Sequence, residues 1–197
     1  MDIFSLGNFL KCNKEDYSYS FLFNLPENKY EYYLKKIYSA RTGLRLNLKN
    51  PKRFNEKIQH LKLYDDMTAK SVYADKILLR DYYKLKTGSD KHLKEILGIY
   101  NSFEEIDFSK LPEKFLIQTN HGSKMLFKIK NKTLMLEKAY DKMKKRFDDW
   151  LGYNFAFCAG FELQYKNIKP RIIIEKLYEN ADNTPVQDFM FFCFNGS

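Results

Sequence analysis

A short polar loop between two predicted strands carries the residues best suited to hold a phosphate. Residues 115–119 and 125–129 are rich in branched and aromatic side chains, as strands are, and residues 120–123 separate them. Gly122 and Ser123 lie at the tip of this loop, where backbone N–H groups can point at an anion. A single glycine is a weak signal, and an ordinary hairpin loop explains the same residues. Both interpretations stay open on these residues alone.

Cysteine and histidine show no spacing typical of a disulfide framework or a metal site. The three residues of each type lie far apart: Cys12, Cys158, Cys193, His60, His92 and His121. The N-terminus lacks the basic start and long apolar run of a signal peptide. No stretch approaches the roughly 20 apolar residues of a membrane span. We therefore expect a cytoplasmic protein, with the inner face of the membrane as an alternative location, and we assign no metal ligand.

The composition describes a globular protein with an excess of positive charge. Of 197 residues, 44% are hydrophobic and 30% charged, enough for one sizeable core or two small lobes. The net charge of +9 favours an anionic partner such as a nucleotide, an acidic polysaccharide, a nucleic acid or an anionic membrane, although a lysine-rich proteome also explains it. The lysines are spread along the chain, which disfavours nucleic acid.

Hydrophobic periodicity predicts an α+β protein in two parts. Residues 1–110 are expected to be mainly helical with one short strand, and residues 111–197 to form the strand–loop–strand, a long helix and further strands. The predicted helices cover residues 28–40, 54–63, 68–86 and 133–151, and the other predicted strands cover residues 96–100, 171–178 and 188–194.

Two features near the C-terminus are unusual. Glu175 and Lys176 follow directly on the buried apolar run 172–174, where charged side chains are costly. Asn195–Gly196 is a strong hairpin-turn signal, but only one flanking strand is present. We therefore expect the chain to be a C-terminally truncated version of a longer protein.

Five stretches together resemble the TupA-like ATP-grasp family, in order and spacing. The resemblance covers about residues 41–196. The stretches are NPKRFNEKIQHLKLYD from Asn50, ADKILLRDYY from Ala74, LPEKFLIQTNHGS from Leu111, YKNIKPRIIIEKLYE from Tyr165 and DFMFFCFNG from Asp188. This family belongs to bacterial surface-polysaccharide synthesis, including teichuronopeptide and capsule, and its members are often labelled glycosyltransferases.

The resemblance implies a fold and a chemistry. ATP-grasp enzymes hold ATP and Mg²⁺ between two α+β lobes, so we expect an ATP-grasp-like lobe here with an incomplete second lobe and no metal-binding segment. The implied reaction activates a carboxylate as an acyl phosphate, which an amine then attacks. The expected partners are a nucleotide and an anionic sugar or polysaccharide precursor.

The resemblance also implies roles for individual residues. Lys76 matches an early phosphate-binding lysine, and Gly122 and Ser123 match the loop that closes over the phosphates. The hinge that contacts adenine corresponds to Glu175, Lys176, Leu177 and Tyr178. An ordinary helix-surface lysine remains the alternative for Lys76, and a simple charged pair at a strand end remains the alternative for Glu175 and Lys176.

The chain departs from the family pattern at two positions. Gln118 stands where the family carries a lysine before the loop, and Lys124 stands where a second glycine is expected. Lys124 offers a replacement charge from a new direction. Two functions therefore stay open: an ATP-dependent ligase or transferase of polysaccharide synthesis, or a catalytically incompetent remnant that binds nucleotide or glycan. A basic nucleic-acid-binding domain is the third and least favoured reading.

Overall fold

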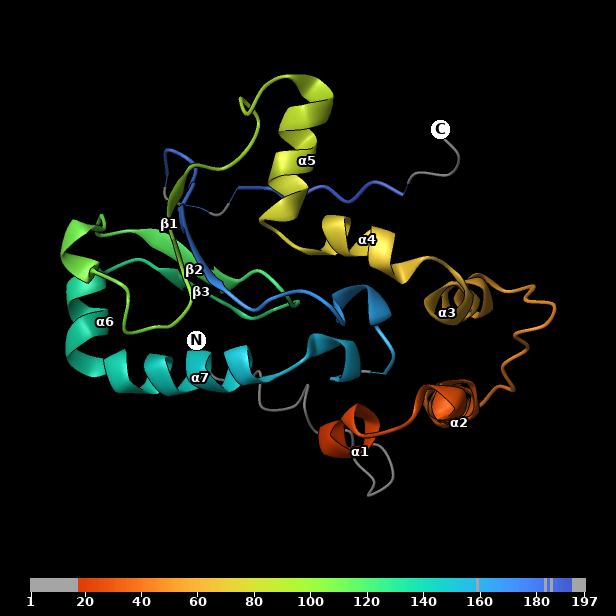
Figure 1. The fold of residues 1–197 in the computed structure, drawn as a ribbon. Coiled ribbons are helices and arrows are strands. Elements are labelled where there is room, and N and C mark those ends of the chain that lie inside the picture. The colour runs from red at the N-terminus through yellow and green to blue at the C-terminus, as the bar shows by residue number, and fades with distance from the viewer. Residues whose placement is uncertain (1–17, 159, 183, 185, 193–197) are drawn as a thin grey trace.

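The chain folds around one four-stranded antiparallel sheet, which confirms the predicted α+β class. The computed structural model describes residues 18–192 except 159, 183 and 185. The strands lie in the order β1-β4-β2-β3 (Figure 1). Their bounds are Ile96–Tyr100 for β1, Phe115–Thr119 for β2, Leu126–Ile129 for β3 and Ile172–Lys176 for β4.

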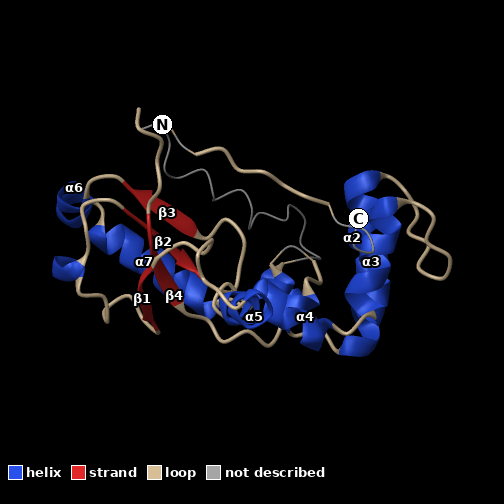
Figure 2. Ribbon diagram, turned by 90° about the horizontal axis from the view of Figure 1, so that it is seen from above, coloured by secondary structure: helices blue, strands red, loops and turns tan. Residues whose placement is uncertain are grey.

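The helices lie on one face of the sheet and to one side of it. In both views α7 runs along one face of the sheet with α6 at its edge, α2 and α3 stand apart from the sheet, and α4 and α5 lie between (Figures 1 and 2). The α-helices are α1 (Tyr19–Phe23), α2 (Tyr30–Thr42), α3 (Phe54–Tyr64), α4 (Met67–Ala74), α5 (Leu78–Thr87), α6 (Lys132–Lys138) and α7 (Tyr140–Gly152). Short 3₁₀ turns cover Glu27–Lys29, Phe108–Lys110, Phe155–Phe157 and Leu163–Tyr165.

The two faces of the sheet have different chemistry. Successive side chains of a strand point to opposite faces, so Phe115 and Ile117 of β2 join the core. That core is sealed by α7, whose Trp150 stacks on Phe127 of β3 with ring centroids 5.4 Å apart. The opposite face carries the alternate residues, among them Gln118 of β2 and Glu175 of β4. We call this second surface the open face.

A second core lies under the N-terminal helices. It joins Leu34 and Ile37 of α2 to Phe157 and Phe161, which are 2% and 0% exposed. The first core instead surrounds the sheet and includes Phe103. Strand β1 pairs antiparallel with β4, so a strand from the N-terminal part of the sequence belongs to the main sheet. The predicted division near residue 110 stays a prediction.

The helix predicted over residues 68–86 is two helices, α4 and α5, with a break at residues 75–77. The Asp75 carboxylate, which is 2% exposed, accepts hydrogen bonds from the backbone N–H groups of Ile77 at 2.8 Å and Leu78 at 3.4 Å. The Lys76 backbone N–H leaves the helical pattern and donates to the Asn120 carbonyl at 3.2 Å. A tertiary contact with the loop after β2 therefore replaces a helical hydrogen bond.

Two other predicted elements also differ. The helix predicted over residues 133–151 is divided into α6 and α7 at Ala139, whose φ of −134° leaves the helical range. The strand predicted over residues 188–194 is wrong for residues 188–192, because they pair with no strand of the sheet and their apolar side chains stay exposed. The rest of that strand and the Asn195–Gly196 turn lie outside the described residues.

Candidate functional site

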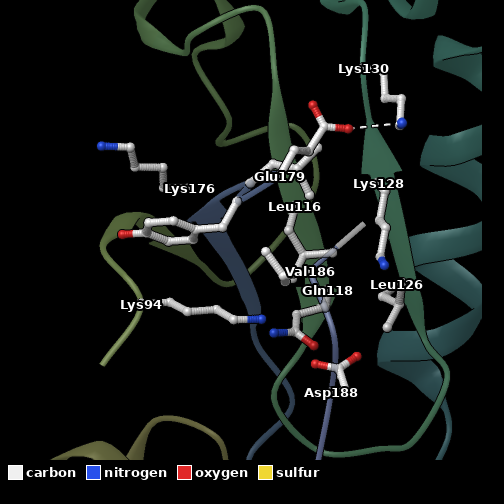
Figure 3. Close-up of a pocket in the computed structure, with 12 residues that line it drawn as sticks. Lys94, Leu116, Gln118, Leu126, Lys128, Lys130, Lys176, Glu179, Val186 and Asp188 are labelled. Carbon is white, nitrogen blue, oxygen red and sulfur yellow. Dashed lines mark ion pairs between the residues drawn. The ribbon is translucent and has the colours of Figure 1, made fainter. Parts of the chain in front are cut away.

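A cavity of about 250 Å³ opens where the hinge segment leaves β4 (Figure 3). Its floor is apolar, with Leu116 of β2 and Leu126 of β3, and its rim is basic. Figure 3 shows Lys128 and Lys130 on one side and Lys94 and Lys176 on the other. The lining is completed by Gln118, Leu177, Tyr178, Glu179, Val186 and Asp188. An apolar floor below a cationic rim suits a ligand that combines a flat ring with anionic groups.

Glu175 is the hub of the polar contacts on the open face. Its carboxylate, only 6% exposed as a residue, accepts from Gln118 Nε2 at 2.7 Å and from Arg80 Nη1 at 3.3 Å. Arg80 also donates to the carbonyl of Lys94. The negative charge after the buried run is therefore stabilised by an arginine and an amide, as a buried carboxylate requires.

No role for Arg80 was predicted from the sequence. The break between α4 and α5 turns its side chain toward β4, where it pairs with Glu175. A signal for it existed in the sequence. A carboxylate placed directly after a buried strand needs a cationic partner.

Lys76 is partly buried and points at the loop. Its Nζ lies 2.5 Å from the Gly122 carbonyl oxygen and 3.5 Å from that of Asn120. Burial lowers the pKa of Lys76, and the Asp75 and Glu175 carboxylates act in the opposite direction. Lys76 therefore lies between α4 and α5, and its amine is held against the loop between β2 and β3.

The loop is anchored by Asn120, which is fully buried. Its side chain accepts from the Arg171 backbone N–H at 2.7 Å and donates to the Lys169 carbonyl at 3.0 Å. The Arg171 N–H donates to the side-chain oxygen of Asn120 and not to its backbone carbonyl. That carbonyl can therefore accept the hydrogen bond from the Lys76 N–H. The amide of Asn120 thus fixes where the loop leaves β2.

Two loop positions have a constrained backbone or little space: Gly122 and Lys124. A Cβ on Gly122 would lie 2.6 Å from the Met125 sulfur and 3.0 Å from the Phe155 ring, so the site admits only glycine without a shift. Lys124 has a φ of +61°, which costs a residue with a Cβ about 1 kcal/mol or more. Ser123 and Lys124 are exposed at the tip. The expected glycine position is therefore a true left-handed position.

Ion pairs hold the hinge segment on both sides. The Lys176 backbone N–H donates to the Glu95 carbonyl at 2.9 Å, and the Lys176 Nζ lies 5.8 Å from the Tyr178 ring centroid. Glu179 bridges Lys130 at 2.8 Å and Lys114 at 2.9 Å. Hydrogen bonds from these two lysines hold the pKa of Glu179 below its usual value.

The predicted site residues fall into two groups along β2. Gln118, Lys176 and Tyr178 line the cavity, and Glu175 contacts Gln118 beside it. The other group, at the loop end of the strand, consists of Lys76, Gly122, Ser123 and Lys124. Strand β2 connects the two groups, with the hinge at one end of the open face and the loop at the other.

Neither a metal site nor a membrane span is found in the part of the chain that the structure describes. It contains no group of three or more His, Cys, Asp or Glu side chains arranged to hold a metal ion. No magnesium ligand is therefore assigned among these residues. No helix within this part is long and apolar enough to cross a bilayer.

His121 is a buried group whose protonation would destabilise the fold. It is 1% exposed, its Nε2 lies 3.0 Å from the Trp150 carbonyl, and its Nδ1 has no hydrogen-bond partner among the described residues. The carbonyl can only accept, so Nε2 carries the proton of the neutral ring. Burial lowers the pKa of His121 below its ordinary value.

We expect stability to fall as the pH drops below the ordinary histidine pKa of about 6.5. Below this pH His121 binds a proton in the unfolded chain but stays neutral in the folded one. The free energy of unfolding therefore falls by at most about 1.4 kcal/mol per pH unit. Urea unfolding at pH 7 and pH 5.5 measures this loss. The variant H121Q keeps a donor toward Trp150 without the titration, so its stability should change less over this range. An equal change in both proteins would contradict the assignment.

Comparison with known proteins gives one family. The profile described as TupA-like ATPgrasp matches residues 56–197, which include every residue of both groups above. No curated protein and no solved structure matches the chain. Since the family match spans well over half of the sequence, the chain belongs to the TupA-like ATP-grasp family.

Proposed function

We propose that the open face binds ATP, with the adenine ring in the cavity beside the hinge and the phosphates directed toward the loop. The observation that carries this proposal is the cavity itself, where the hinge residues Lys176 and Tyr178 meet an apolar floor under a basic rim. Backbone groups after β4 would form hydrogen bonds with the edge of the adenine ring, and Leu116 and Leu126 would pack on its face. Lys76 and the loop N–H groups would face the phosphates.

We further propose that the nucleotide serves a ligase of surface-polysaccharide synthesis that joins an amine to a sugar carboxylate. Bound ATP would supply the phosphoryl group that activates the carboxylate. The side chains of this chain would hold and orient the phosphates, and their positive charge would offset the charge that develops during transfer. We place this activity in the cytoplasm, where ATP is available, or at the inner face of the membrane.

A nucleotide-binding protein without catalysis is the second candidate. Two observations favour it: Gln118 brings no charge and gives its amide donor to Glu175, and Lys124 holds a strained backbone where a glycine would be relaxed. Both candidates predict ATP binding. ATP turnover in the presence of amine and sugar-acid acceptors separates them.

ATP with Mg²⁺ should raise the melting temperature. A ligand that binds the folded state alone at about 100 times its Kd adds about 2.7 kcal/mol, which corresponds to a rise of roughly 5–10 °C for a chain of this size. Thermal unfolding followed by intrinsic fluorescence measures the shift.

The control variant L126W fills the floor of the cavity with a larger apolar side chain and should show a much smaller shift. GTP and adenosine report on the base and the phosphates separately. No shift in the wild-type protein at millimolar ATP would overturn nucleotide binding. A binding of DNA or RNA that weakens steeply with salt would support the nucleic-acid alternative instead.

A further inference from the structure

We propose that Arg171, the residue directly before β4, is a phosphate-binding residue and supplies the charge that Gln118 does not supply from β2. The assignment rests on the proposed ATP site. It names a side chain to which no role was assigned from the sequence, and it is carried by strand register, by the burial of the Arg171 Nε atom and by that atom's lack of a partner.

The register places Arg171 on the open face at the loop end of the sheet. Leu116 lies opposite Glu175 and Gln118 lies opposite Ile173 in the antiparallel pairing of β2 with β4. The pairing continues one step further, where the Asn120 N–H donates to the Arg171 carbonyl at 3.0 Å. Because side chains alternate along a strand, Arg171 shares a face with Ile173 and Glu175.

The Arg171 guanidinium has no partner in the described part of the chain. Its Nε is buried without a hydrogen bond, and no ion pair or side-chain hydrogen bond of this arginine is formed with a described residue. The contrast with Arg80 is clear, because Arg80 donates both to Glu175 and to the Lys94 carbonyl. A buried donor left unpaired destabilises the fold, and buried polar atoms are nearly always paired.

The position of this unpaired donor points to an anion. In the described residues the buried side-chain atoms without a partner are Arg171 Nε and His121 Nδ1, and both flank Asn120. His121 follows Asn120 in the sequence, and the Arg171 carbonyl accepts a hydrogen bond from the Asn120 N–H. Neutral His121 cannot compensate a negative charge, whereas an arginine fork matches phosphate oxygens in a bidentate geometry.

Charge balance on the open face supports the same assignment. Arg80 is already paired with Glu175, and Gln118 gives its amide donor to that same carboxylate. Without Arg171, partly buried Lys76 would face several phosphate charges at the loop end. Arg171 brings a second cation to this end from the neighbouring strand.

The test compares R171M with the wild-type protein for two probes, ATP with Mg²⁺ and adenosine. Isothermal titration calorimetry should show the Kd for ATP raised about tenfold or more in R171M, with the Kd for adenosine unchanged. The matched control is K169M, which removes an exposed lysine two residues away and should bind both probes as the wild type does.

Two further variants extend the test, and the first of them keeps it decisive if R171M folds poorly. The variant R171K keeps the charge without the fork, and we expect an ATP affinity between those of wild type and R171M. The double variant Q118K/R171M restores a cation from β2 and should regain ATP affinity over R171M.

An unchanged Kd for ATP in R171M or R171K overturns the assignment. Equal losses for ATP and adenosine overturn it as well, because they indicate a structural role. Absence of ATP binding by the wild-type protein is seen before any variant is made, and it overturns the proposed function together with the assignment that rests on it.

Discussion

Replacing Lys76 by methionine should weaken ATP binding about 100-fold, because it removes a charged donor from the phosphate end of the open face. The Lys76 amine already lies 2.5 Å from the Gly122 carbonyl, so it stands where the loop would meet a phosphate. Burial lowers the pKa of Lys76, because the amine is partly removed from water. A phosphate would provide the counter-charge that water does not. Calorimetry with ATP and Mg²⁺ measures the loss.

Stability measurements separate this role from a structural one. The methionine loses the hydrogen bonds to Gly122 and Asn120 but also removes the cost of a partly buried charge, so the free energy of unfolding should change little. The matched control K91M removes an exposed lysine of the next loop and should leave ATP affinity unchanged. If K76M bound ATP as tightly as the wild type, Lys76 would be no part of the phosphate site.

The unusual position of Glu175 and Lys176 was visible in the sequence, because charged residues directly after a buried strand are rare without a reason. Glu175 and Lys176 stood out on that ground alone, and the structure places them beside a cavity. Lys124 was flagged as a poor substitute for glycine, and its φ of +61° confirms that the position is left-handed. The first case departs from a local rule of chain chemistry, and the second departs from the family pattern.

The positions that could not be predicted are those set by contacts between distant segments. The helical period continues from α4 into α5, so nothing in the pattern marks a break at residues 75–77. The break follows from the Lys76 N–H bonding Asn120, a residue far along the chain. The same break directs Arg80 to Glu175. A role for Arg171 could not be predicted for a similar reason. The face of the sheet on which its side chain lies depends on the register of β4 against β2.

The open face can carry polar groups because the other face of the sheet is packed firmly, and Phe147 is central to that packing. It is 0% exposed on α7, stacks on Phe103 at 5.5 Å and meets Trp150 edge-on at 5.0 Å. The variant F147A should lower the free energy of unfolding by about 3–5 kcal/mol, through lost transfer energy and the cavity left behind. This is a large part of the roughly 5–15 kcal/mol that stabilises an ordinary domain. Urea unfolding followed by tryptophan fluorescence measures it.

Two comparisons show whether the effect comes from this packing. The same substitution at Phe189, which is 72% exposed, should change stability by no more than about 0.5 kcal/mol. F147L keeps most of the buried volume and should lose much less than F147A. In F147A the ATP affinity of the protein that remains folded should stay close to wild type, because the nucleotide is proposed to lie on the opposite face of the sheet. A stability loss under about 1 kcal/mol would contradict the packing that separates the two faces.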